Sequence, residues 1–170
     1  QKLAGKQHGA ARNETGVLEI GHGGYVTYPH DGRFDLRQPL SVACRVYFEK
    51  PTKTPVVVSC GHWRQAGWFL QHLGGGWRWH VGGVDCDGGK VQSGRWIHVV
   101  GTYDGKRLRL YQDGKLVAKK AGTFLMAPWR GDLHIGQYSG QPGTAYQVIG
   151  KIKDSRLYHR PLEAAEVAEL

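Results

Sequence analysis

The fold of this chain is decided by Trp96-Ile97-His98-Val99-Val100-Gly101-Thr102-Tyr103-Asp104-Gly105, which is followed by Leu108-Arg109-Leu110-Tyr111-Gln112-Asp113-Gly114. Both runs are rich in β-branched and aromatic residues, and each ends in an Asp-Gly pair, a strong signal for the tight turn of a hairpin. We therefore interpret Asp104 and Asp113 as turn residues rather than catalytic acids. The two runs predict consecutive antiparallel strands.

Short apolar runs continue on both sides of this hairpin, with turn signals about every 8–12 residues, as in a sandwich or jelly roll. Glycine accounts for 26 of the 170 residues, about twice its usual share of ~7%. Only the residues from Pro161 onward are predicted to form a helix. The sequence therefore predicts a single all-β domain over residues 1–170, a two-sheet antiparallel jelly-roll β-sandwich with a short C-terminal helix. The other strands are expected within Leu18–Tyr28, Leu40–Phe48, Val56–Cys60, Gly67–Leu73, Trp77–Val81, Leu116–Ala118, Leu133–Ile135 and Lys151–Tyr158.

The charge balance favours an anionic partner. The chain has 23 Lys and Arg against 14 Asp and Glu, a formal net charge of +9 with neutral histidines. Such a surplus suits nucleic acid, an anionic membrane surface or an acidic polysaccharide, although a merely solvated basic surface is an equal alternative. The cations are scattered and form no tract of five or six, which argues against a nucleic-acid-binding tail. No run approaches the ~18–20 apolar residues of a membrane-spanning helix.

The three cysteines, Cys44, Cys60 and Cys86, are too few for a disulfide scaffold and lack the spacing of a zinc site. Cys44 alternates with Val42 and Val46 and is expected to be a buried thiol. Cys60 and Cys86 each lie near the end of a predicted strand, and whether they pair is left open.

The central hairpin, read as W-x-H-V-x-x-T-Y-D-G and then L-x-L-Y-x-D-G, resembles that of laminin-G-like, concanavalin-A-like jelly-roll domains. The closing segment Gly150–Leu162 and the opening segment Leu18–Pro29 resemble the same family, and Gln7-His8-Gly9 is similar to its earlier N-H-G strand. The resemblance implies an extracellular or periplasmic location. It says little about function, because the fold hosts lectins, carbohydrate-binding modules, adhesion domains, glycosidases and lyases.

The resemblance also implies a structural calcium ion, held in part by an acid in the opening turn and another at the position of Lys153. Here the turn reads Gly21-His22-Gly23-Gly24, and a lysine ammonium cannot supply an oxygen ligand. We therefore expect no cofactor, and we expect the Lys153 ammonium to take over the ion's contacts to backbone carbonyls. If calcium does bind, Asp154 is the remaining candidate ligand.

The acidic residues do not favour catalysis. A retaining glycosidase needs two carboxyl groups about 5–5.5 Å apart, which alternate positions on a strand supply. The acids two residues apart, Asp85 and Asp87, lie in a glycine-flanked segment that we interpret as a turn. A polysaccharide lyase needs a group that neutralises the uronate and a Tyr/His pair, but the lyase signatures of the family are missing. Residues of the right types for a lyase are Gln71, His72, Arg78, His80 and Tyr138.

Three tryptophans are expected in the core. Trp77 and Trp79 alternate with Arg78 and His80 along one predicted strand. Trp96 begins the central hairpin, where the resemblance implies a core tryptophan. Arg78 and His80 consequently face away from the core. They would form a basic and aromatic floor if their strand shares a sheet with the strands of Arg45, Tyr47, Arg109 and Tyr111.

The best candidates for ligand binding are aromatic rings beside cations, since a ring stacks on a sugar and a guanidinium pairs with a carboxylate or sulfate. Trp63 lies between His62 and Arg64 in one predicted loop, and Trp129 precedes Arg130 in another. Each tryptophan could instead close the end of the sandwich. The full set of candidates adds Arg78, His80, Arg109, Tyr111, Tyr138 and Tyr146.

Together these observations predict a noncatalytic carbohydrate-binding module for an anionic polysaccharide, uronate or sulfated, within a larger secreted bacterial enzyme. The chain begins at Gln1 without an apolar signal core, and it therefore looks like a piece of a longer polypeptide. The expected partner is a polysaccharide, with no nucleic acid and no membrane span. The alternatives are a protein-adhesion or spacer domain, and a polysaccharide lyase or glycosidase of the same fold.

Overall fold

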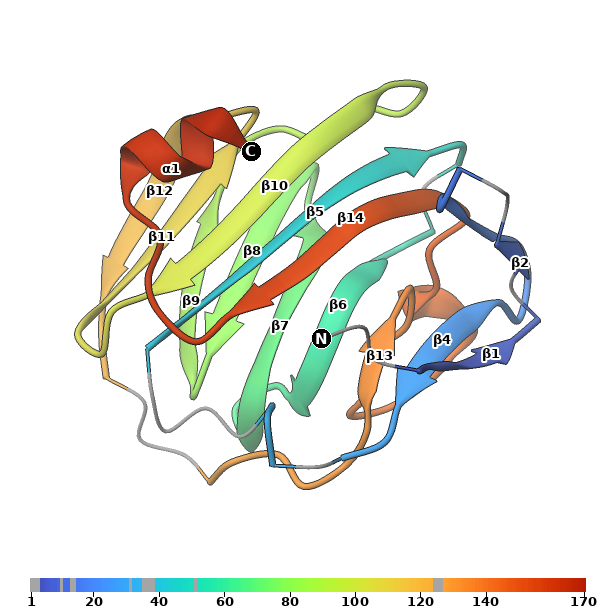
Figure 1. The fold of residues 1–170 in the computed structure, drawn as a ribbon, viewed down its shortest axis with the longest axis horizontal. Coiled ribbons are helices and arrows are strands. Elements are labelled where there is room, and N and C mark those ends of the chain that lie inside the picture. The colour runs from blue at the N-terminus through green and yellow to red at the C-terminus, as the bar shows by residue number, and fades with distance from the viewer. Residues whose placement is uncertain are drawn as a thin grey trace.

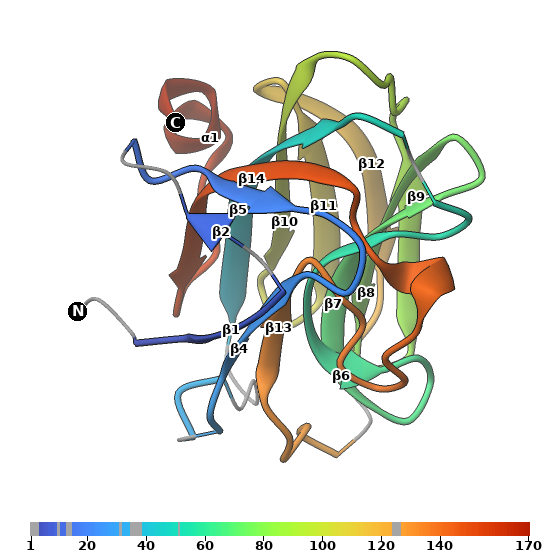
Figure 2. The ribbon, with the colours of Figure 1, turned by 90° about the vertical axis from the view of Figure 1, so that its right-hand side faces the viewer.

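A computed structural model of the chain describes residues 4–9, 11–12, 15–30, 32–34, 39–50, 52–123 and 127–170. They form two antiparallel sheets packed face to face, with one short α-helix and one 3₁₀ helix (Thr144–Tyr146) outside them (Figures 1 and 2). In spatial order, sheet I consists of β1 (Lys6–His8), β4 (Tyr25–Tyr28), β13 (Leu133–Ile135), β6 (Val56–His62), β7 (Ala66–Leu73), β8 (Gly76–Val81) and β9 (Val84–Gly88). Sheet II consists of β12 (Lys115–Ala121), β11 (Arg107–Gln112), β10 (Trp96–Tyr103), β5 (Leu40–Phe48), β14 (Gly150–Tyr158), β3 (Leu18–Ile20) and β2 (Ala11–Arg12).

The central hairpin forms as predicted, with β10 and β11 paired from Val99↔Gln112 to Tyr103↔Leu108. Asp104 Oδ1 accepts hydrogen bonds from the backbone N–H groups of Lys106 and Arg107, at 2.9 and 2.8 Å. Asp113 adopts a left-handed conformation with φ of 50°, and its Oδ1 accepts the backbone N–H of His98 at 3.0 Å. Both aspartates therefore shape turns, and the predicted jelly-roll class is confirmed.

The core lies between the inner faces of the two sheets. Trp77 and Trp79 are 1% and 0% exposed, which confirms their predicted burial. The Trp79 indole N–H donates to the carbonyl of Thr102 across the sandwich at 3.1 Å. At Gly101 an added Cβ would clash with the Trp79 ring, so the absence of a side chain there lets the indole fill the space between the sheets.

The expectation for Trp96 is wrong. Ile97 and Val99 take the inward positions of β10, so Trp96 falls on the outer face of sheet II, where its ring centroid lies 5.8 Å from that of Tyr47. The Lys153 ammonium lies 4.4 Å from the centroid of the Trp96 ring. This corrects the prediction that Lys153 would replace a calcium ion among carbonyls, since its partner is an aromatic face.

The candidate calcium ligand, Asp154, lies in a bulge of β14, with φ of 53°. One of its carboxylate oxygens lies 3.5 Å from Arg45 Nε. Within the described part of the chain, no group of three or more His, Cys, Asp or Glu side chains is arranged to hold a metal ion.

All three cysteines are buried thiols, and Cys60 and Cys86 do not form a disulfide. They lie on the inward positions of β6 and β9, as Cys44 does on β5. Burial raises the pKa of Cys44 to about 12 and that of Cys86 to about 11.

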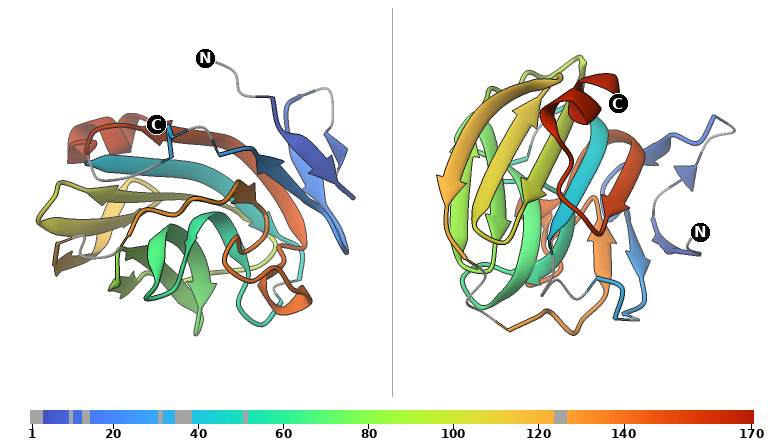
Figure 3. Two further views of the ribbon diagram at one scale, coloured as in Figure 1. Left: turned by 90° about the horizontal axis from the view of Figure 1, so that it is seen from below. Right: turned by 60° about the vertical axis from the view of Figure 1, so that its left-hand side comes forward.

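Helix α1 (Ala164–Glu169) packs on the outer face of sheet II (Figure 3). Val167 and Leu162 form a small apolar cluster there with Tyr111, which is 3% exposed. The prediction that Tyr111 binds ligand is wrong, because the C-terminal segment covers it. Arg160 makes two hydrogen bonds with the Glu166 carboxylate, at 2.8 and 2.6 Å, and so fixes the helix. No helix among the described residues has the length and apolar character needed to span a membrane.

Candidate functional site

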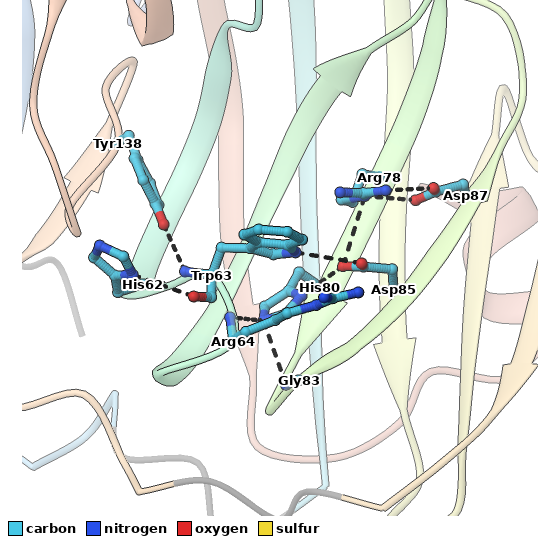
Figure 4. Close-up of polar contacts among 9 residues, drawn as sticks. All are labelled: His62, Trp63, Arg64, Arg78, His80, Gly83, Asp85, Asp87 and Tyr138. Atoms are coloured by element: carbon cyan, nitrogen blue, oxygen red, sulfur yellow. Dashed lines mark hydrogen bonds and ion pairs between the residues drawn. The ribbon is translucent and has the colours of Figure 1, made fainter.

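Polar and aromatic side chains gather on the outer face of sheet I, at the end where the β6–β7 and β8–β9 hairpins turn (Figure 4). Five structural elements supply them: the end of strand β6, the β6–β7 turn, strand β8, strand β9, and the segment that follows β13. We call this group the Trp63 site, and it consists of His62, Trp63, Arg64, Arg78, His80, Asp85, Asp87 and Tyr138.

The segment that contains Asp85 and Asp87 is a strand and not a turn, which corrects the sequence interpretation. Cys86 occupies its inward position, so both aspartates point outward. The β8–β9 register sets Arg78 opposite Asp87 and His80 opposite Asp85. Both acids are absent from the candidates predicted from sequence, although the alternation of Val84, Asp85, Cys86 and Asp87 after two glycines is a usable signal for a strand.

Arg78 is held by both carboxylates. Its Nε and Nη2 donate to the two oxygens of Asp87 at 2.8 and 2.7 Å, and its Nε lies 3.6 Å from Asp85 Oδ1. This two-pronged contact fixes the guanidinium plane on the surface of the sheet. The side chain predicted to meet a ligand is therefore already paired within the protein.

His80 organises the site from beneath, with a side chain that is fully buried. Its Nε2 lies 3.3 Å from the backbone nitrogens of Arg64 and Gly83. Backbone N–H groups only donate, so Nε2 is the acceptor and the ring proton resides on Nδ1, which donates to Asp85 Oδ1 at 2.6 Å. The imidazole also stacks on Phe69, with 4.6 Å between ring centroids. One buried ring thus fixes both hairpin turns.

Trp63 is 42% exposed and does not close the end of the sandwich. Its indole N–H donates to Asp85 Oδ2 at 3.3 Å, and its backbone N–H donates to the Tyr138 hydroxyl at 2.5 Å. The Arg64 guanidinium carbon lies 4.4 Å from the centroid of the Trp63 ring. The result is an oriented aromatic ring at the surface, with a cation against one face.

Tyr138 supports this arrangement from a buried position, at 6% exposure. Its ring contacts those of Phe69, Tyr146 and His62, with centroids 5.4, 5.1 and 5.7 Å away. Burial raises the pKa of Tyr138, so its hydroxyl stays protonated at neutral pH. Three of the candidate residues, Tyr138, Tyr146 and His62, therefore lie together, with Tyr138 behind the exposed ring.

The carboxylate of Asp85 is the electrostatic centre of the site. Burial acts to raise the pKa of Asp85, but hydrogen bonds from His80 and Trp63, together with the nearby guanidinium, outweigh it and leave the pKa below its usual range. Asp85 is therefore an anion at neutral pH, and the groups around it are donors.

Other predicted residues lie elsewhere. Trp129 is half-buried, its indole N–H donates to the Asp132 carbonyl at 3.3 Å, and it packs against the core beside Gly67, so it closes the end of the sandwich. Arg130, next to it, is exposed. Arg109 is paired with Asp104 at 2.8 Å on sheet II. The condition for a floor common to all six residues is not met, because Arg78 and His80 belong to sheet I whereas sheet II carries Arg45, Tyr47, Arg109 and Tyr111.

A family model described as the concanavalin A-like lectin/glucanases superfamily matches residues 20–168. The chain belongs to this superfamily. The match spans most of both sheets and the helix, so the concanavalin A-like classification applies to the domain that carries the Trp63 site. No curated protein matches the chain.

Solved structures similar to this concanavalin A-like domain share its fold. Trypanosoma rangeli sialidase in complex with the inhibitor DANA gives a TM-score of 0.73 at 20% identity, covering 96% of this chain and 28% of the sialidase chain. The binding domain of botulinum neurotoxin DC in complex with SialylT gives 0.73 at 11% identity, covering 98% and 45%. A botulinum neurotoxin type C structure, from work on cell entry through two ganglioside molecules, gives 0.76 at 11% identity, covering 98% and 45%. The chain thus spans less than half of each of these longer chains.

Proposed function

We propose that this domain is a noncatalytic carbohydrate-binding module and that sugar binds at the Trp63 site. The observation that carries the proposal is the state of Trp63, which is 42% exposed although its indole and backbone N–H groups are both hydrogen-bonded. An aromatic ring that is oriented before binding loses little freedom when a ligand stacks on it. Carbohydrate rings present C–H faces that suit such a surface.

The comparisons support a sugar as the class of ligand. The superfamily is named for lectins and glucanases. The similar botulinum structures concern a binding domain in complex with SialylT and a toxin that enters cells through gangliosides. Laminin-G-like domains are typically extracellular, which supports our placing this module in a larger secreted polypeptide.

The positive charge of the chain supports an anionic polysaccharide as the ligand. The net charge is +9, and the Arg64 side chain is exposed beside Trp63. Among the ion pairs of the described residues, none involves Arg64. Its guanidinium is thus available to a uronate carboxylate or a sulfate, whereas Arg78 is already held by Asp87.

The same geometry supports binding without bond cleavage. A general acid in glycoside hydrolysis must hold its proton near neutral pH, whereas the pKa of Asp85 is lowered. His80 is buried and its Nε2 already accepts two backbone N–H groups, so it offers no free base to a substrate. The pairing of Arg78 leaves it poorly suited to neutralise a uronate in a lyase.

Binding assays with Trp63→Ala, Arg64→Gln and a control test the proposal. Leu116→Ala is a suitable control, because Leu116 is the other large apolar side chain that is strongly exposed among the described residues. Calorimetry with uronate, sulfated and neutral oligosaccharides should show acidic-sugar binding that is lost in Trp63→Ala, weakened in Arg64→Gln and unchanged in the control. Unaltered affinity in Trp63→Ala, or the release of ultraviolet-absorbing unsaturated ends from a uronate polymer, would overturn it. The absence of measurable binding to every glycan would favour an adhesion or spacer domain.

A further inference from the structure

A second group of cations lies where the β10–β11 turn meets the end of β12. We call these four exposed residues the cation corner: Lys106, Arg107, Lys119 and Lys120. In the described part of the chain none of them takes part in an ion pair, whereas Arg78, Arg95, Arg109 and Arg160 each face a carboxylate within 3 Å.

The pairing of β11 with β12 sets Arg107 and Lys119 on the outer face of sheet II, whereas Lys120, opposite buried Leu108, points to the other face. Arg109 lies directly opposite Lys119, and Arg107 lies opposite Ala121. Like charges placed opposite each other across two strands are destabilising. Asp104, in the β10–β11 turn, already binds the Arg109 guanidinium and two backbone N–H groups. Within the described part of the chain, therefore, no ion pair balances the four cations.

The backbone of the cation corner lies beside strand β9, one of the strands that carry the Trp63 site. The backbone N–H of Gly122 donates to the carbonyl of Lys106 at 2.9 Å, which ties the end of β12 to the β10–β11 turn. A Cβ at Gly122 would lie 2.6 Å from a methyl group of Val84, the residue before Asp85. Strands β9 and β12 accordingly run side by side at the closed edge of the sandwich (Figures 1 and 2).

We infer that the cation corner is a second contact region for the same ligand, where sulfate or carboxylate groups of one polysaccharide chain bind while a sugar of that chain stacks at Trp63. The inference rests on the proposed function and specifies its substrate as a polymer. Alternate residues on a strand are ~6.8 Å apart, so cations on two strands and a turn cover more surface than one sugar. Affinity should therefore increase with chain length and fall with salt.

Two variants of equal charge separate this corner from the general basic surface. The corner variant carries Lys106→Gln, Arg107→Gln, Lys119→Gln and Lys120→Gln. The control carries Lys50→Gln, Lys53→Gln, Lys90→Gln and Lys115→Gln, four exposed lysines. These lysines lie toward the end of the sandwich opposite the β10–β11 turn. Lys50 and Lys53 follow the end of β5 where Tyr47 pairs with Trp96, whereas the other end of β5, at Leu40, pairs with Tyr103 next to the turn. Lys115 pairs with Gln112, at the end of β11 far from that turn.

The probes are heparin, polygalacturonate, a short oligosaccharide of whichever polymer binds, and single-stranded DNA of matched length. At low salt the corner variant should bind the polymer about tenfold more weakly or worse than the control variant, with a shallower dependence on salt, and should bind the short oligosaccharide normally. Equal polymer affinity in the two variants would refute the inference, as would equally tight binding of single-stranded DNA.

The readouts keep the two proposals distinct. Trp63→Ala measured with the short oligosaccharide tests the sugar site alone, and the corner variant measured with the polymer tests the extension. Thermal melting of each variant checks that it is folded. If Trp63→Ala binds both the oligosaccharide and the polymer with wild-type affinity, the proposed sugar site is refuted. If Trp63→Ala loses affinity but the corner variant binds the polymer as tightly as its control variant, the sugar site stands and the second contact region is refuted.

Discussion

The imidazole Nδ1 of His80 donates a hydrogen bond to Asp85 Oδ1 over 2.6 Å, and this single contact links the buried layer of the Trp63 site to its surface. On the far side of the ring, Nε2 accepts the backbone N–H groups of Arg64 and Gly83. On the far side of the carboxylate, Oδ2 accepts the indole N–H of Trp63. The position of the exposed ring therefore depends on a histidine whose side chain is fully buried.

Replacing His80 by alanine should destabilise the domain by about 2–4 kcal/mol, because two backbone N–H groups and a carboxylate would lose their partner and a stacked ring would be removed. Urea unfolding followed by circular dichroism measures this. His22→Ala, at an exposed turn position, should change stability by less than about 0.5 kcal/mol. Equal effects of the two substitutions would contradict the role assigned to His80.

Low pH should lower the unfolding free energy of the domain by protonating Asp85. The folded-state pKa of Asp85 is depressed, so its contribution to stability is complete above the unfolded pKa of ~3.9 and is lost as the pH falls through the lower folded value. The difference in unfolding free energy between the wild type and Asp85→Asn should be constant between about pH 7 and 5. It should narrow below about pH 4, and a difference that instead grows in acid would contradict a depressed pKa for this carboxyl group.

Tyr138→Phe should weaken sugar binding by about threefold to tenfold. The substitution removes the hydroxyl that accepts the Trp63 backbone N–H and helps to hold Trp63 in place, which should reduce the free energy of binding by about 1 kcal/mol. Stability should change little, because the ring still packs on Phe69 and Tyr146. Calorimetry measures the affinity. Tyr146→Phe is the matched control, and an equal loss in that variant would show that hydroxyl groups in general, rather than this contact, matter.

Gly101→Ala should cost about 1–3 kcal/mol through overpacking, because the added methyl would clash with the Trp79 ring. Gly21→Ala, where a Cβ meets nothing within 4 Å and φ is not positive, should be close to neutral. Thermal unfolding of both variants compares them. A neutral Gly101→Ala would mean that the indole can move aside.

Most of the fold is predictable from the sequence because hairpin turns have local signals. Asp104-Gly105 and Asp113-Gly114 mark both ends of β11, and alternation identifies which residues of β5 and β8 face inward. Alternation does not say which sheet a strand joins. For that reason a surface shared by Arg78 and Arg109 is compatible with the sequence, although the two residues lie on different sheets.

The errors in the site have related causes. The family resemblance predicts a core position for Trp96, but its place in the alternation of β10 sets it outside. The glycines that closely flank Asp85 and Asp87 on both sides predict a turn, yet these acids lie on a strand. Tyr111 has the outward position that alternation predicts, but a helix from the far end of the chain covers it. A contact between residues so far apart in the chain leaves no signal in the sequence around Tyr111.

The three buried thiols have a practical consequence. Cys44, Cys60 and Cys86 sit on inward positions of three different strands, each as a small apolar filler and none in a disulfide. The stability of the sandwich therefore does not depend on a disulfide bond. We therefore expect the domain to fold in a reducing host compartment without an oxidative refolding step, and reductant added during purification should leave it intact.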